Sequence, residues 1–269
     1  MGDLWGSAGE LMPVLFVGHG SPMNAIEDNE FTRGFRREAL ALPKPRAILC
    51  VSAHWETHGS LVTSMKKPST IHDFYGFPRD LCDVEYPAPG SKWLAEEVVK
   101  TVSNQAVRLS EEWGLDHGCW AVFRRMYPEA DVLVVQLSLD REKSHRDHYE
   151  LAKQLAPLGG EGVLIIGSGN MVHNLGLAEP RGEDFNAEFG FDWAIEANDI
   201  LKRLIGEGNH DLLIEYLKLG RAVQLVVPTN EHYLLMLYAL ALRGEDEPIT
   251  YFNDKPVAGS LTMTSFRIG

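Results

Sequence analysis

Short, nearly continuous apolar runs separated by amphipathic stretches constrain this chain more than any other feature of its sequence. Runs rich in Val, Ile and Leu predict strands at 14–17, 47–52, 132–137 and 163–166, with a further candidate at 222–227. Because these runs are continuous rather than alternating, they are typical of strands covered on both faces. Their alternation with helices predicts an α/β sandwich with a central, largely parallel or mixed sheet flanked by helices.

Amphipathic patterns between these runs predict the helices, which cover 31–41, 91–103, 120–126, 145–155, 185–205, 211–217 and 231–242. The tail differs, since 249–252 and 260–268, joined by a turn at Asn253 and Asp254, predict a hairpin that extends the sheet edge. No repeat or linker divides the chain. We therefore expect one domain over residues 1–269, with residues 1–12 as a flexible lead-in.

The charge balance excludes several classes of partner. The chain has 25 basic and 38 acidic side chains, a formal net charge of −13, and no basic block. This argues against binding to nucleic acid or to anionic membranes. The apolar runs are also too short to span a bilayer. Cys50, Cys82 and Cys119 form no metal-binding spacing, and so few cysteines predict reduced thiols and a cytoplasmic location.

The segment from Lys66 to Gly90 interrupts the regular alternation of strands and helices. It is dense in proline, aromatic and turn residues and has little periodicity. A loop of this length in a compact domain is usually functional, which predicts a lid or a pocket wall. The alternative is an irregular surface insertion. His72, inside this loop, could line a pocket.

Three of the predicted strands lead directly into a polar turn that carries a histidine: His19, His54 and His173. Ligands of open α/β sheets bind at the carboxyl ends of the strands, so these side chains could meet in space. His232, between an apolar run and a helix, has the same position. Imidazole is a common ligand of zinc, iron and copper, and a catalytic site typically uses three protein ligands. Each histidine alone would more often be structural, but together they predict a shared metal site.

His117 lies beside Asp116 in a turn before a helix. It could bond to an anionic substrate oxygen, or simply form a hydrogen bond at the start of the helix. The remaining histidines lie among charged or turn residues and are predicted to be solvated: His58, His145, His148 and His210. The sequence contains neither a GxSxG elbow nor a GxxxxGK[ST] loop, which argues against serine-hydrolase chemistry and nucleotide binding.

The turns that carry these histidines form recognisable motifs. They read Gly18-His19-Gly20-Ser21-Pro22, Ser52-Ala53-His54-Trp55, Leu115-Asp116-His117-Gly118, Ser168-Gly169-Asn170-Met171-Val172-His173-Asn174 and Glu231-His232-Tyr233, with Ile71-His72-Asp73-Phe74 in the long loop. In this order they resemble the 4,5-DOPA extradiol dioxygenase family, a branch of the class III ring-cleaving dioxygenases. The resemblance extends from about Met12 to the C-terminus.

The resemblance implies an enzyme that opens the aromatic ring of a catechol, such as DOPA, with O2. It implies that His19, His54 and His232 hold a divalent metal. His173 would be either a fourth ligand or the acid/base residue that faces the substrate. His117 would contact a catechol oxygen or bound dioxygen. The partners are then a small catechol and O2, within a single extradiol dioxygenase-type catalytic domain.

The identity of the ion stays open at this stage. The protocatechuate branch of the same class uses two histidines and one glutamate, the usual set for non-haem iron. Here Glu231 precedes His232, and we expect His232 to be the ligand. An all-histidine site also suits tetrahedral zinc, so the bound ion could be Zn(II) while turnover needs Fe(II). Two alternatives are a metal-bound, non-enzymatic interaction protein of the Memo type and a zinc hydrolase whose ion activates water.

Overall fold

One sheet of eight strands forms the centre of the protein. A computed structural model describes residues 11–182 and 184–269, and within it the strand order is β4-β3-β5-β2-β6-β1-β10-β7. The strands are β1 (Val14–Gly18), β2 (Ala47–Thr57), β3 (Ser60–Thr63), β4 (Val107–Ser110), β5 (Leu133–Asp140), β6 (Val163–Gly169), β7 (Ile249–Phe252) and β10 (Ser265–Ile268), and β8 (Pro256–Val257) pairs with β9 (Leu261–Thr262). Residues 1–10 of the predicted lead-in lie outside the described residues, whereas Met12 is buried and belongs to the fold.

The four central strands run parallel, and this brings their carboxyl ends to one rim. β5, β2, β6 and β1 pair in parallel, whereas β3 pairs antiparallel with β5, and β10 pairs antiparallel with both β1 and β7. The predicted C-terminal hairpin is confirmed, since β7 and β10 extend the sheet beyond β1. The mixed sheet with flanking helices confirms the predicted fold class.

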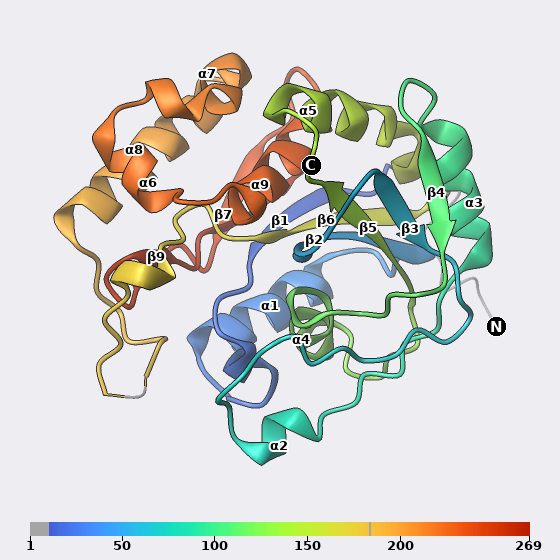
Figure 1. The fold of residues 1–269 in the computed structure, drawn as a ribbon, viewed down its shortest axis with the longest axis horizontal. Helices are drawn as coiled ribbons and strands as arrows, with labels where there is room; N and C mark the ends of the chain where they lie inside the picture. Colours follow the sequence, from blue (N-terminus) through green and yellow to red (C-terminus); the bar gives the residue numbers. More distant parts are fainter. Residues whose placement is uncertain (1–10, 183) are drawn as a thin grey trace.

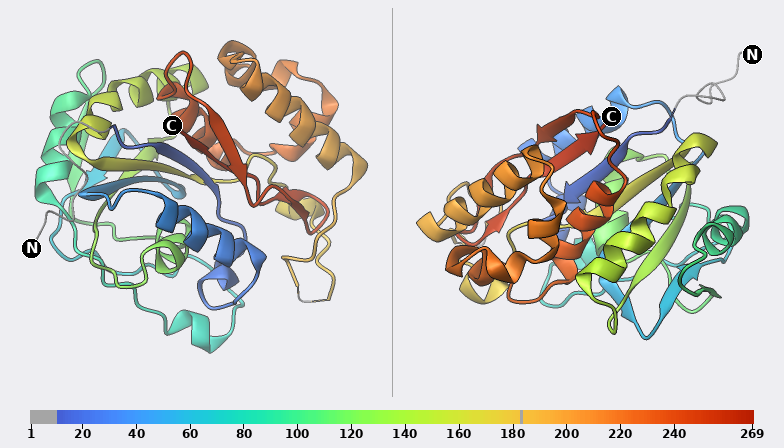
Figure 2. Two further views of the ribbon diagram at one scale, coloured as in Figure 1. Left: turned by 180° about the vertical axis from the view of Figure 1, so that it is seen from behind. Right: turned by 90° about the horizontal axis from the view of Figure 1, so that it is seen from above.

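Helices cover both faces of the sheet. They are α1 (Glu30–Ala41), α2 (Arg79–Cys82), α3 (Lys92–Thr101), α4 (His117–Met126), α5 (His145–Gln154), α6 (Asp192–Gly206), α7 (His210–Ile214), α8 (Arg221–Val226) and α9 (Glu231–Ala241), with 3-10 turns η1 (Pro22–Ala25), η2 (Ala156–Glu161), η3 (Leu175–Leu177) and η4 (Tyr216–Lys218). In Figures 1 and 2, α5, α6 and α9 lie on one side of the sheet and α1 and α4 on the other.

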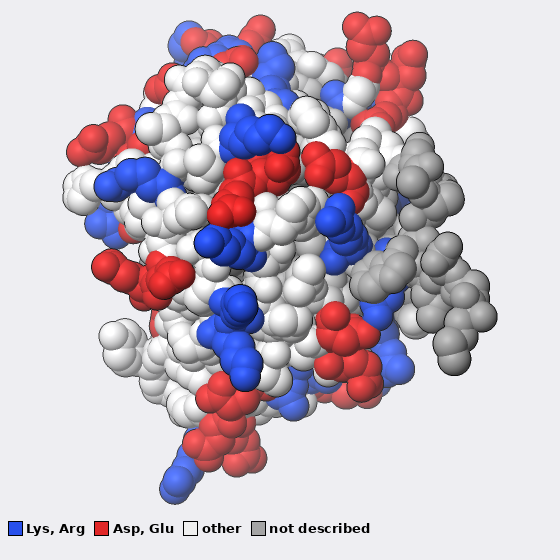
Figure 3. Space-filling model, turned by 90° about the vertical axis from the view of Figure 1, so that its right-hand side faces the viewer, with Lys and Arg blue, Asp and Glu red and all other residues white. Residues whose placement is uncertain are grey.

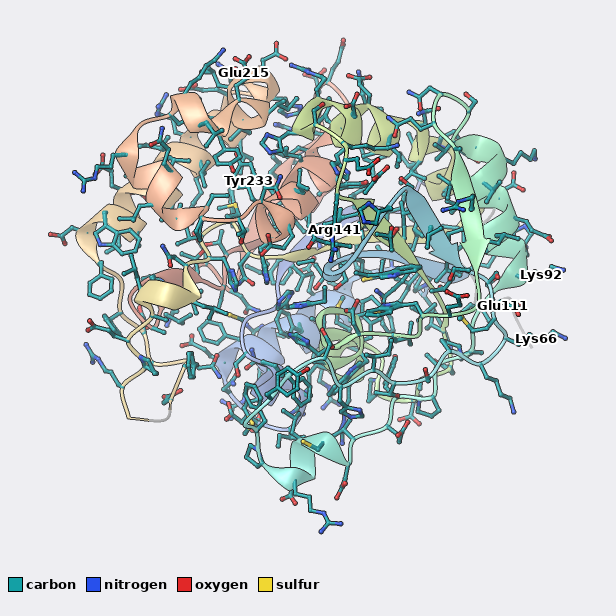
Figure 4. The ribbon with its side chains drawn as sticks, viewed as in Figure 1. Lys66, Lys92, Glu111, Arg141, Glu215 and Tyr233 are labelled. Atoms are coloured by element: carbon teal, nitrogen blue, oxygen red, sulfur yellow. The ribbon has the colours of Figure 1, made fainter. Side chains whose placement is uncertain are left out.

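Alternating side chains of β2 contribute to two hydrophobic cores. Leu49 and Val51 join the core under α5 and α9, while Ile48 and Cys50 join the core under α1 and α4. This burial on both faces is what the continuous apolar run predicts. Helix α9 is apolar on all sides for the same reason, and Tyr233, labelled in Figure 4, is buried with its hydroxyl donating to the Leu213 carbonyl at 2.9 Å.

Two predicted elements are wrong. The candidate strand at 222–227 is helix α8, in which Val223 and Val226 are buried and the residues between them are not. Burial three residues apart fits a helical period and not that of a strand. The predicted helix 185–205 begins only at Asp192, because residues 187–191 bond instead to the backbone of residues 258 and 259, as in the Phe191 N–H donating to the Gly259 carbonyl at 2.8 Å.

Strand β2 is longer than its apolar run, since it continues to Thr57 with a shift of register between Val51 and Glu56. His54 therefore lies within an irregular stretch of strand and not in the turn that the sequence predicts. An irregularity of this kind redirects side chains at the rim of a sheet. The short strands β3 and β4 are also absent from the sequence prediction.

The surface mixes charges of both signs. On the face shown in Figure 3, Lys and Arg side chains are interspersed with Asp and Glu. Within residues 11–182 and 184–269, no helix is both long and apolar enough to cross a bilayer.

The prediction that four histidines are solvated is confirmed only for His58. His145 and His210 are half-buried, and His148 is 1% exposed. The two ring nitrogens of His148 lie 3.0 Å from the Tyr238 hydroxyl and 3.1 Å from the Asp140 carbonyl oxygen. Burial lowers the pKa of His148 from 6.5 to about 4, so the folded protein holds it neutral.

Acid should therefore weaken the fold through His148. The unfolded chain takes up a proton near pH 6.5 and the folded one only near pH 4, so stability present above pH 6.5 is lost as the pH falls toward 4. This difference in pKa corresponds in full to about 3 kcal/mol of the free energy of unfolding. We expect the free energy of unfolding, measured with urea between pH 7 and 4.5, to depend less on pH in His148→Gln than in the wild type. In His58→Gln it should depend on pH as in the wild type. Parallel curves for wild type and His148→Gln would contradict this.

Candidate metal centre and active site

Five histidines from distant parts of the chain meet at the rim formed by the carboxyl ends of the parallel strands. His19 follows β1, His54 lies in the irregular part of β2, His117 begins α4, His173 follows β6, and His232 is the second residue of α9. The close approach depends on glycine. A Cβ on Gly169 would lie 2.2 Å from the His232 carbonyl oxygen, so only glycine lets β6 pass so near the start of α9.

The rings of His19, His54 and His232 form a nearly equilateral triangle. Their centroids are 5.1, 5.0 and 5.2 Å apart, and one nitrogen of each lies within 4.8 Å of the others. The Nε2 atoms of His19 and His54 are 3.2 Å apart. Two ligands about 2.1 Å from one ion at the tetrahedral angle are about 3.4 Å apart, so this spacing fits a shared cation.

Hydrogen bonds fix which nitrogen of His19 carries the proton. The hydroxyl of Ser168 donates to the Gly118 carbonyl at 2.5 Å, because a carbonyl can only accept. Its oxygen must then accept from His19 Nδ1, which lies 3.1 Å away. His19 therefore holds its proton on Nδ1 and presents the lone pair of Nε2 to the cluster.

A carboxylate has the same effect on His54. Nδ1 of His54 lies 3.4 Å from Oδ2 of Asp73, which favours a proton on that nitrogen. The Nε2 atoms of His19 and His54 then face each other with their lone pairs. Such an arrangement is repulsive without a cation between the two atoms, and a ligand histidine that donates its other N–H to a carboxylate or hydroxyl is the usual pattern at protein metal sites.

Burial keeps these imidazoles neutral. His19 and His232 are 4% and 5% exposed, and burial first, then the neighbouring histidines, lowers the pKa of each well below 6.5. The same causes lower the pKa of His54 to about 3. Among the described residues, the buried Nδ1 of His232 has no hydrogen-bond partner. Neutral nitrogens and one unpaired buried nitrogen fit a divalent cation, which needs unprotonated ligands.

Asp73 also orients His117. Its Oδ1 accepts from the His117 backbone N–H at 2.9 Å, and its Oδ2 lies 2.9 Å from His117 Nδ1. Burial alone would raise the pKa of Asp73, but the hydrogen bonds from His117 and the nearby His54 lower it below the usual value. As a carboxylate, Asp73 holds the proton of His117 on Nδ1, which leaves Nε2 free to accept one.

His173 lies beside the triangle of histidines. Its ring stacks on that of His232 with centroids 3.5 Å apart and planes 12° from parallel. Imidazole lone pairs lie in the plane of the ring, so an ion in the plane of His232 would be roughly 3.5 Å from the plane of His173, too far for a bond of about 2.1 Å. The carboxylate of Glu231 is also within 4.8 Å of ligand atoms of His173 and His232.

A second carboxyl group, that of Asp116, is buried next to His117 in the chain. Asp116 is fully buried, and its oxygens accept from the Ser52 hydroxyl and the Gln136 amide, both at 2.7 Å. Burial, followed by the charge of Asp73, raises its pKa despite these bonds. Asp116 also caps α4 by accepting from the Cys119 N–H, which places His117 at the start of the helix.

The histidines open into a cavity of about 320 Å³ with mostly apolar walls. Its lining includes all five histidines, Asp73, Phe74, Phe77, Phe185 and Leu261. The long loop 66–90 thus supplies one wall, as predicted. His72, which the sequence suggested could line the pocket, is not among the lining residues. Its Nε2 lies 2.9 Å from the Val84 carbonyl oxygen, and its ring packs against Trp120.

Residues 13–253 match the family described as the catalytic LigB subunit of aromatic ring-opening dioxygenase. The chain belongs to the LigB family. This membership confirms the predicted resemblance and the prediction of a ring-opening dioxygenase, and it gives no support to a non-enzymatic role or a zinc hydrolase.

Curated relatives cover nearly the whole chain. A 4,5-DOPA dioxygenase extradiol of Escherichia coli K12 is 44% identical over 262 residues, covering 96% of this chain and 95% of that protein. A protein of the same name from Beta vulgaris is 33% identical and covers 97% of this chain and 98% of its own length. The crystal structure of an uncharacterized Escherichia coli K12 protein has a TM-score of 0.82 and 39% identity, covering 96% of this chain and all of that one.

The sequence interpretation assigned no role to Asp73. It appears there only within the motif Ile71-His72-Asp73-Phe74, in a loop without periodicity. The structure places it between His54 and His117. An acidic residue beside a histidine in a loop expected to line the pocket was the available signal, but its partners lie 19 and 44 positions away and cannot be read from spacing.

Replacing Asp73 should loosen a bound cation. Asp73→Asn removes the charge that favours the Nδ1 proton of His54, and the loss of such a partner typically weakens metal affinity about 10- to 100-fold. Competition of the variant with a chromophoric chelator for Zn(II) measures this. Asp80→Asn changes an exposed carboxylate of the same loop and should leave the affinity unchanged. Equal affinities of Asp73→Asn and wild type would refute this role.

Proposed function

We propose that this protein is a metal-dependent extradiol dioxygenase that opens the ring of a catechol such as DOPA with O2. The observation that carries the proposal is the triangle of neutral imidazoles from His19, His54 and His232, which lines a cavity with mostly apolar walls. The names of the relatives support the same reaction, since those from Escherichia coli and Beta vulgaris are both called 4,5-DOPA dioxygenase extradiol.

We assign the metal to His19, His54 and His232. When bound there, Fe(II) supplies the redox chemistry that joins a catechol to O2, whereas redox-inert zinc fills the same site without it. The mostly apolar walls, with Phe74 and Phe77, suit a flat aromatic ring and exclude water from the reacting atoms. Membership of the family supports a divalent metal.

The remaining histidines supply proton transfer. Because Asp73 holds the proton of His117 on Nδ1, Nε2 of His117 can accept the hydroxyl proton of a catechol. His173, stacked on His232, cannot share an ion with it in good geometry, so we favour the acid/base role over a fourth ligand. The sparse, free cysteines support the cytoplasm as the compartment.

The reaction itself can be tested directly. Iron-loaded protein mixed with DOPA without oxygen and then exposed to air should consume O2 and form a yellow semialdehyde. Zinc-loaded protein should consume none, and elemental analysis of freshly purified protein identifies the native ion. Absence of oxygen uptake with every catechol would refute the proposal, and cleavage of an ester without oxygen would favour a hydrolase.

Single substitutions separate the ligands from the proton-transfer residues. His54→Ala should lose nearly all bound metal, because it removes one of three ligands. His117→Ala should retain the metal but lower kcat about 100-fold or more, as expected for loss of an acid/base group. Metal content and oxygen uptake measure the two effects. His58→Ala, an exposed histidine near the end of the same strand, serves as the control, and normal metal content in His54→Ala would contradict the assignment.

A further inference from the structure

A second cavity of about 660 Å³ adjoins the first. Ser21, Phe77 and Phe185 line both, so the two spaces lie next to each other. The outer cavity is bounded by the turn before α1, the tip of the long loop and the segment around residue 185, and the last two lie on the same lower side of the molecule in Figure 1. A ring substituent of a molecule bound in the inner cavity would point toward the outer one if it leaves the ring on the side of Ser21, Phe77 and Phe185.

Among the described residues that line the outer cavity, Glu27 carries the formal charge. Nδ2 of Asn186 donates to Glu27 Oε2 at 3.0 Å, and Nδ2 of Asn29 lies 3.4 Å from the same oxygen. Within the described residues, Oε1 accepts no hydrogen bond. The carboxylate is thus held in place by two amides from different segments and keeps one oxygen available for a donor.

Among the described residues that line the two spaces, the charged groups are Asp73 and Glu27, and none is Lys or Arg. Arg125 lies near Glu27, with its guanidinium donating to the backbone carbonyls of Asn24 and Glu27 at 2.7 and 2.6 Å, but it lines neither cavity. An anionic substituent would meet no cationic side chain among the described lining residues, whereas an ammonium group would meet a carboxylate.

We propose that Glu27 is a specificity-determining residue that selects catechols whose ring substituent carries an ammonium group, bound in the outer cavity. This inference rests on the proposed function for the placement of the catechol ring. Asn186 and Asn29 act as positioning residues for the carboxylate. The ligand class is a catechol with a short aliphatic amine, and a catechol with only a carboxylate on its substituent is disfavoured.

Three catechols that differ mainly in the charge of a short substituent test this. They are dopamine, neutral 4-ethylcatechol and anionic 3-(3,4-dihydroxyphenyl)propionate. Wild-type iron-loaded protein should rank them in that order by kcat/KM. Glu27→Gln should lower kcat/KM for dopamine about tenfold, change kcat/KM for 4-ethylcatechol by less than about twofold, and raise kcat/KM for the propionate. Asp28→Asn removes an exposed neighbouring charge that pairs with Arg33 and should preserve the wild-type ranking.

Binding to zinc-loaded protein, measured by calorimetry without turnover, separates this inference from the proposed function. Weaker binding of dopamine by Glu27→Gln, with 4-ethylcatechol unaffected, supports the inference even if no catechol is cleaved. Cleavage of all three catechols with the same ranking in wild type and Glu27→Gln overturns the inference and leaves the dioxygenase intact. A parallel loss for all three compounds would also overturn it, because it would indicate a general structural defect.

Discussion

The repulsion between facing imidazole lone pairs is the constraint on which the site depends. His19 and His54 each have their Nδ1 proton committed to another group, Ser168 in one case and Asp73 in the other, so the two Nε2 atoms 3.2 Å apart cannot bond to each other. Burial prevents protonation from relieving this repulsion, because it lowers the pKa of both rings. A divalent cation bound between them would remove the repulsion and would also give the buried His232 a partner, so the arrangement of these histidines favours cation binding.

The two carboxyl groups beside the site, Asp73 and Asp116, have different roles because their surroundings differ. Asp73 is held ionised by His117, whereas burial raises the pKa of Asp116, which binds Ser52 and Gln136 instead. The contact of Asp73 with His54 bears on the lack of a carboxylate in the proposed ligand set. A carboxylate that accepts the other N–H of a ligand histidine raises the basicity of that ligand, and so gives an all-histidine site part of the negative charge that ferrous iron favours.

The sequence predicts those features that a single strand or turn determines. The continuous apolar runs identify the central strands, and histidines after them identify the rim, because both signals are local. The failures arise where distant contacts outweigh local preference: residues 187–191 pair with residues 258 and 259 instead of starting α6, and His148 is buried although its neighbours are charged. The role of Asp73 also depends on distant contacts, because it arises only from the packing of the long loop against His54 and His117.

Assembly of the site therefore depends on the long loop as much as on the sheet. The Ile71 N–H donates to the Leu115 carbonyl at 2.7 Å, and two residues further on Asp73 binds both the backbone and the ring of His117. The next residue, Phe74, forms part of the cavity wall. Because the same few residues anchor the loop, set the proton positions of two histidines and contact the space for the ring, loop packing and metal-site electrostatics cannot vary independently. Asp73 therefore connects the aromatic wall of the cavity to the proposed metal ligand His54, with Oδ2 3.4 Å from Nδ1 of that histidine.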